Sequence, residues 1–181
     1  MMASCLCVKD VEQAWSLVKN KQEISFDEIL EASAWATQHT SSQRRQDCCQ
    51  HGTCALSALG DDLLLQTCDR LVEFLHAAII TYTSGHFLGC AMEEPRVVAS
   101  RSAIRFGDYS LDDDESQTVV ALDLITMSLR SLIDVVRQMK EHDSAGQKQG
   151  RFMRDRAAQV FEAAVTLLSY CRTAQAKSPR P

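Results

Sequence analysis

A stripe of apolar residues in the middle of the chain constrains the fold more than any other feature. Its members recur every three or four positions, so they share one face of a single helix. They are Leu64, Cys68, Leu71, Leu75, Ala78 and Tyr82. Leu65, Val72 and Ile79 widen this stripe. We therefore expect a long helix, capped by Asp61 or Asp62, at the centre of the fold.

Further segments on both sides of this helix have helical signatures. They are residues 5–19, 25–40, 53–59, a segment that begins at 112–115, and 151–173. Ser25 and Glu28 form a capping box, in which each side chain satisfies the other residue's backbone N–H. Gly60 is expected to close the short helix at 53–59. The sequence thus predicts an all-α domain of five to six helices in bundle-like packing.

The helix that begins at residues 112–115 carries the most regular stripe in the chain. Its apolar positions are Leu122, Ile125, Leu129, Leu132, Val136 and Met139. From Leu122 the spacing alternates between three and four, which is typical of a coiled-coil seam. The stripe spans fewer than three heptads, so we expect core packing, with a homodimer seam or the binding of a partner as the alternatives.

Residues 85–110 differ from the rest because helical periodicity is lost there. Gly85, Gly89, Pro95 and Gly107 interrupt the segment. No strand-like alternation is visible, so we expect one long loop at 85–110. Loops of this length inside a compact domain are usually functional or mobile.

Length and composition limit the class of protein. The 181 residues suit one domain, expected at 1–173, followed by a disordered tail at 174–181. A net charge of -5 without a basic run argues against direct binding of nucleic acid. No stretch approaches the ~18 apolar residues of a membrane helix. The N-terminus lacks a signal-peptide core, so the eight cysteines are expected to be reduced, in cytoplasm or nucleus.

Four polar residues are candidates for acid or base chemistry. His76 and Tyr82 lie on the central helix, His86 follows in the 85–110 loop, and Asp123 has apolar neighbours on both sides. Side chains of these types can transfer protons when they line a pocket between the helix and the loop. The ordinary alternative is a half-buried histidine, a tyrosine that reaches water and a solvated carboxylate, which we favour.

A dense group of possible metal ligands lies at residues 48–54. Cys48 or Cys49 with His51 and Cys54 supplies three of the four ligands that zinc requires. Cys54 beside His51 could also be a reactive thiol. We expect structural packing here, with no bound metal and no cofactor.

Three stretches resemble the C-terminal regulatory domain of the fungal aflatoxin regulatory protein family. They are residues 26–32 followed by Cys48, Cys49 and Cys54, the leucine-rich residues 63–75, and residues 104–112, which read I-x-x-G-x-Y-x-L-D. The resemblance spans about residues 20–175. Family members are zinc-cluster transcription activators of secondary-metabolite genes, but the six-cysteine cluster that precedes this region in them has no counterpart here.

The resemblance implies a regulatory domain of fungal secondary metabolism without a DNA-binding module of its own. Its partner would be a hydrophobic pathway metabolite or another protein. The alternative is a cofactor-independent cyclase or isomerase that folds a polyketide or terpenoid intermediate in a helical pocket. In that case His76, Tyr82, His86 and Asp123 would be its catalytic residues.

Overall fold

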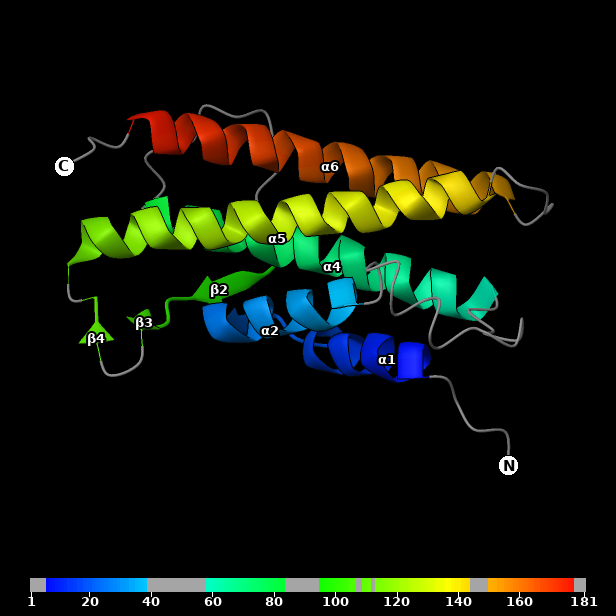
Figure 1. Cartoon of the computed structure of the whole chain (residues 1–181), viewed down its shortest axis with the longest axis horizontal. Coiled ribbons are helices and arrows are strands. Elements are labelled where there is room, and N and C mark those ends of the chain that lie inside the picture. The colour runs from blue at the N-terminus through cyan, green and yellow to red at the C-terminus, as the bar shows by residue number, and fades with distance from the viewer. Residues whose placement is uncertain are drawn as a thin grey trace.

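The protein is a bundle of long helices with two small strand pairs, of which β3 and β4 lie at one end of the bundle while β2 lies alongside the helices (Figure 1). The computed structural model describes residues 6–38, 58–83, 95–106, 109–111, 113–143 and 150–177. Within them the helices are α1 (Leu6–Val18), α2 (Phe26–Thr37), α4 (Ala58–Thr83), α5 (Asp114–Asp143) and α6 (Gly150–Lys177). The predicted all-α, bundle-like fold is confirmed. No helix in the described ranges combines the length and apolarity needed to cross a membrane.

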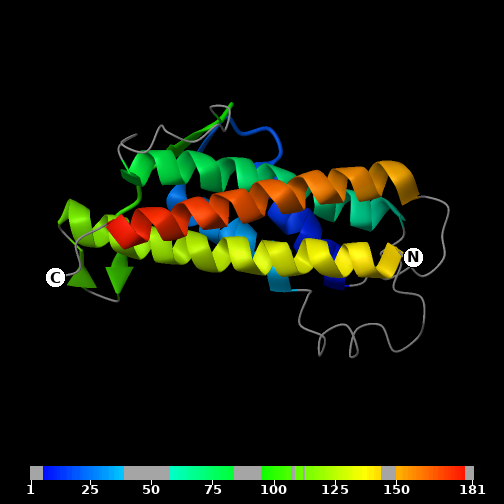
Figure 2. The same cartoon turned by 90° about the horizontal axis from the view of Figure 1, so that it is seen from above.

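Helix α4 lies at the centre of the bundle, as its apolar stripe predicts. It packs against α1, α2, α5 and α6, and Figure 2 shows it lying beside the antiparallel pair α5 and α6. Leu65, Leu71 and Leu75 are fully buried. The burial of these large side chains against four helices is the main stabilising contribution of α4.

The predicted start of the central helix is wrong. Helix α4 begins at Ala58, so Gly60 lies inside it instead of closing a separate short helix. Glycine costs only about 1 kcal/mol in a helix, and the packing of α4 outweighs that cost. The rest of the short helix expected at 53–59 lies outside the described residues.

The regular stripe on α5 forms part of the core. Leu122, Ile125, Leu129, Leu132 and Val136 are all buried within the single chain. The expectation of core packing is therefore confirmed, and these side chains are not available as a seam between two copies. A homodimer remains a prediction that would need another surface.

Helix α6 extends past its predicted end at residue 173. It ends at Lys177, and Ala174 keeps only 3% of its surface exposed. The helix continues because its apolar face still has core to cover at this position. The boundary expected between helix and tail at 174 was thus placed too early.

Two short strand pairs contradict the expectation that the chain lacks strands. Strand β1 (Glu23–Ser25) pairs in parallel with β2 (Val98–Ser100), and β3 (Arg105–Phe106) pairs antiparallel with β4 (Tyr109–Ser110). Strands of two or three residues are too short to show an alternating pattern in the sequence. The described part of the predicted 85–110 loop is therefore partly ordered in strands, and Val97, Ala99 and Ile104 are buried.

The capping box predicted at the start of α2 is present. The Ser25 hydroxyl accepts from the Glu28 N–H at 3.4 Å, and the Glu28 carboxylate accepts from the Ser25 N–H at 3.1 Å. Lys21 Nζ lies 2.6 Å from the same carboxylate. The hydrogen bond and charge of Lys21, followed by the Ser25 N–H, hold the Glu28 pKa below its usual value.

Candidate functional site

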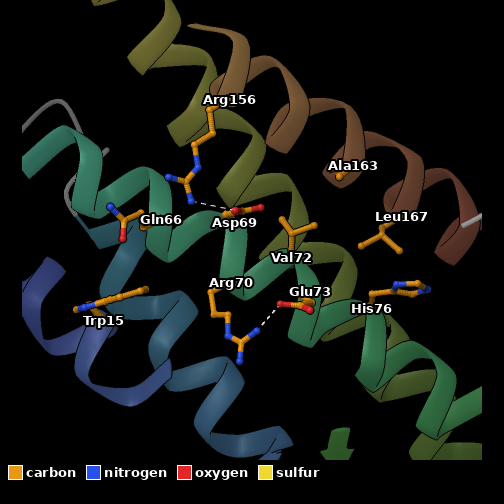
Figure 3. A pocket seen from close by; sticks show the side chains of 10 residues that line it. All are labelled: Trp15, Gln66, Asp69, Arg70, Val72, Glu73, His76, Arg156, Ala163 and Leu167. Carbon is orange, nitrogen blue, oxygen red and sulfur yellow. Dashed lines mark hydrogen bonds and ion pairs between the residues drawn. The ribbon is translucent and has the colours of Figure 1, made fainter. Parts of the chain in front are cut away.

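A groove runs along α4 between α1 and α6. Both helices pack on α4 but make no extensive contact with each other, so within the described part of the chain the sector of α4 between them is uncovered. The groove is open to solvent and has a volume of about 390 Å³. Its lining residues come from all three helices (Figure 3): Trp15, Gln66, Asp69, Arg70, Val72, Glu73, His76, Arg156, Ala163 and Leu167.

An arginine from α6 bridges to the floor at one end of the groove. Arg156 Nη2 lies 3.2 Å from an Asp69 carboxylate oxygen, and its Nη1 lies 4.0 Å from Asp62. Gln66 donates to Asp62 at 2.6 Å, one turn away on the same helix. The Arg156 side chain is 30% exposed, whereas Asp62 and Asp69 are 38% and 53% exposed. The charge that solvent reaches at this end is therefore mainly negative.

A second arginine connects α4, which forms the floor of the groove, to the segment that follows α1. Arg70 Nη1 donates to Glu73 at 2.5 Å, and Nη2 donates to the backbone carbonyl of Lys21. The guanidinium also lies 4.8 Å from the centre of the Phe74 ring. The Arg70–Glu73 pair is neutral as a unit, and both side chains are about three-quarters buried.

Among the predicted site residues that the structure describes, His76 is the one that lines the groove. It is half-buried beside Val72 and Leu167 (Figure 3). Burial lowers the pKa of His76, against a smaller opposing effect of the Glu73 carboxylate. The imidazole is therefore neutral at pH 7, and can both donate and accept a hydrogen bond.

Tyr82 lies in the core, away from the groove. Its hydroxyl donates to the Ser102 carbonyl and accepts from the Ser102 N–H, both at 3.2 Å. Its ring packs edge-on against Phe26, with 5.0 Å between centroids, and Arg101 lies over it at 5.3 Å. Burial raises the pKa of the Tyr82 phenol. These contacts give Tyr82 a structural role, because they hold the segment around Ser102, between β2 and β3, against α4.

The other candidate acid or base residues are not brought to the groove. Asp123 is exposed on α5 and accepts a 2.7 Å hydrogen bond from Gln175 on α6. His86 lies outside the described residues. Among the described candidates, His76, Tyr82 and Asp123 thus occupy three separate environments, and catalysis by any of them stays a prediction.

The cysteine-rich segment cannot be placed. Cys48, His51 and Cys54 all fall outside the described residues, so the metal and thiol hypotheses remain untested. Within the described ranges, no cluster of three or more His, Cys, Asp or Glu side chains is arranged to hold a metal ion. Cys68 and Cys171 are free thiols in the core, and burial raises the pKa of each to about 12. They are inert at neutral pH.

Sequence reasoning missed most of the groove. Trp15 lies in the helix expected at 5–19 without being singled out as a site residue, and it is half-buried at the groove wall. Arg70 and Arg156 gave no separate signal, because arginines on amphipathic helices are usually solvated. The available signal was the polar side of α4, where Gln66, Asp69 and Glu73 recur at helical spacing.

Comparison with known proteins links the chain to fungal secondary metabolism. The protein named "Clavatol biosynthesis cluster protein B", from Penicillium crustosum, is 29% identical in an alignment that covers 78% of this chain and 82% of that relative. No family model matches the chain, and no solved structure matches it significantly. The chain is thus similar to a protein of a fungal biosynthetic cluster. The resemblance to the aflatoxin regulatory family remains a prediction.

Proposed function

We propose that this protein is a regulator of a fungal secondary-metabolite pathway that acts by binding through the groove on α4. The similarity to a biosynthesis cluster protein supports the pathway. The open form of the groove, between two helices that do not close over it, is the observation that favours binding over chemistry.

A cofactor-independent cyclase makes different demands on its site. It needs an enclosed, largely apolar cavity in which two or more polar groups converge on the substrate. Here the groove is open and its floor is charged. His76 is present in it, but the Tyr82 hydroxyl is engaged with Ser102 and Asp123 lies on another helix. The described candidates therefore do not form an acid–base pair.

Deletion of the gene in its native fungus distinguishes the two functions. Loss of a regulator should lower the transcripts of the pathway genes together, with all intermediates decreasing. Loss of an enzyme should leave those transcripts unchanged and cause one intermediate to accumulate. Incubation of the purified protein with that intermediate should then give product, an outcome that would exclude the regulatory function.

His76 provides a second readout in the same strain. Complementation with His76→Asn, which keeps a neutral hydrogen-bonding side chain in the groove but cannot exchange a proton, should restore the transcripts if the protein is a regulator. Complementation with the unaltered gene is the control. Failure of His76→Asn to restore product while transcripts are normal would support catalysis.

A further inference from the structure

We infer that the groove on α4 receives an amphipathic helix of another protein, with an apolar stripe and a basic residue at one end. This inference rests on the proposed function, since it names the kind of partner through which the regulator would act. Three observations carry it: the packing around α4, the dimensions of the groove and its exposed charge.

The packing around α4 leaves room for one more helix. Helices α1, α2, α5 and α6 form an arc around α4, in which α1 contacts α2, α2 contacts α5 and α5 contacts α6. The arc is open between α6 and α1, and that opening is the groove. A helix laid there would pack on α4 as its fifth neighbour and would contact α1 and α6 on its sides.

The groove has the length of a short helix. Its floor runs from Gln66 to His76, which is about 15 Å, or about three helical turns, at 1.5 Å per residue. The walls provide apolar surface from Trp15 on one side and from Ala163 on the other, next to Leu167, which is only 1% exposed. Ala163 lies one turn before Leu167, and its small side chain permits close approach of a partner backbone. A three-turn stripe of apolar residues fits these walls.

The exposed charge determines which helix fits. The groove lining contains two acidic and two basic residues, so the charges of Asp69 and Glu73 balance those of Arg70 and Arg156. Asp62, which lies just outside the lining and 4.0 Å from Arg156, adds one negative charge. The excess is at the end near Asp62 and Asp69, whose carboxylates are more exposed than the arginine they share. A lysine or arginine of the partner at this end would complement them. A second copy of this chain would instead bring the same carboxylates together.

The composition of the lining suits a protein partner. Tryptophan and arginine are the side chains most enriched among residues that dominate binding energy at protein interfaces, and the groove has one tryptophan and two arginines. A small molecule in this groove would keep one side in water, because none of the helices and strands in the described residues covers it. A helix would cover the groove along its whole length and exclude that water.

Photo-crosslinking at the groove wall tests this inference. Ala163 is replaced by a compact diazirine amino acid of about the size of leucine, which leaves room for the partner in the groove. The full chain is expressed in the native fungus, and the crosslinked peptides are sequenced. The control carries the same probe at Val165, which is on α6 but 40% exposed and outside the groove. We expect a partner peptide that only the probe at 163 captures, with apolar residues three or four apart and a lysine or arginine.

A synthetic peptide of the captured sequence then provides the affinity test. In a Trp35→Phe variant, whose remaining tryptophan is Trp15, peptide binding should shift the tryptophan emission. Ala163→Trp should weaken binding at least tenfold by filling the groove, whereas Val165→Trp should leave it unchanged. Because both variants add a tryptophan, their affinities are measured by calorimetry. Asp69→Lys should weaken binding and reduce its dependence on salt.

Several outcomes would overturn the inference. They are identical products from the probes at 163 and 165, a crosslink to a second copy or to a small molecule, and a peptide whose binding is insensitive to Ala163→Trp. The proposed function can survive these failures. If gene deletion lowers the pathway transcripts but Ala163→Trp does not, the protein is a regulator and the groove is not its contact surface.

Discussion

The hydroxyl of Tyr82 is expected to stabilise the fold, and Tyr82→Phe isolates its contribution. The substitution keeps the ring, its edge-on contact with Phe26 and its position under Arg101. It removes only the two hydrogen bonds to the backbone of Ser102. The residue is 2% exposed, so water cannot replace the hydroxyl without disturbing the packing.

The expected loss follows from the geometry of these bonds. A neutral hydrogen bond contributes about 0.5–1.5 kcal/mol net. Both distances are 3.2 Å, which is long for a hydroxyl, so we place each bond near the lower end. Ser102 is half-buried, so part of its backbone can be rehydrated. We expect a loss of about 1–2 kcal/mol, or about 2–8 °C in Tm for a chain of this length.

Urea unfolding followed by circular dichroism measures this loss, with Ser131→Ala on the exposed side of α5 as the control. The control should change the free energy of unfolding by less than about 0.5 kcal/mol. Tyr82→Leu should cost more than Tyr82→Phe, because it also loses the aromatic contact, which contributes about 0.5–1.5 kcal/mol. A Tyr82→Phe protein as stable as the parent, but without biological activity, would refute the structural assignment and restore Tyr82 as a catalytic acid.

Three further predictions concern the core, the groove and the capping box. Leu129→Ala should cost about 2–5 kcal/mol in urea unfolding, whereas Met127→Ala, at a side chain 63% exposed, should change stability by less than about 0.5 kcal/mol; equal losses would contradict the burial of the stripe. NMR titration should find the pKa of His76 below 6.5. The burial of neutral His76 then contributes stability that is present above pH 6.5 and decreases as pH falls through the folded-state pKa. A pKa above 6.5 would contradict the burial of His76. Because the pKa of Glu28 is lowered from 4.5, Glu28→Gln should destabilise the protein at pH 7, and the two stabilities should converge as pH falls below 4.5 in unfolding curves.

The helices could be predicted because their signals are local and repeated. The stripe around Leu71 on α4 and the stripe around Leu129 on α5 each contain several apolar residues at one spacing, and the Ser25 capping box satisfies identifiable backbone groups. The strands could not be predicted, because β1 and β2 are three residues each and their pairing joins Ile24 to Ala99 across the chain. Such pairing depends on how the helices place the two segments.

The candidate site was harder to predict because three helices distant in sequence form it. The groove forms only after α1 and α6 have packed on α4, which brings Trp15, Arg70 and Arg156 to one surface. The sequence identified His76 because histidine is chemically conspicuous, and it grouped Tyr82 with it because both are on one helix. Six positions separate the two along α4, which turns them by about 240° relative to each other at 100° per residue. Consequently one faces the groove and the other faces the core.

The opening on α4 is nevertheless a property of its sequence. A sector of about 120° on the helix, plotted at 100° per residue, contains five polar residues: Gln66, Asp69, Arg70, Glu73 and His76. A helix enclosed on every side would place buried charges in that sector, at a cost of several kcal/mol per unpaired charge. The bundle avoids this cost by leaving the sector uncovered and by pairing its charges with neighbours. The same polar sector that prevents a fifth helix of this chain from packing there leaves a surface for a partner with complementary charge.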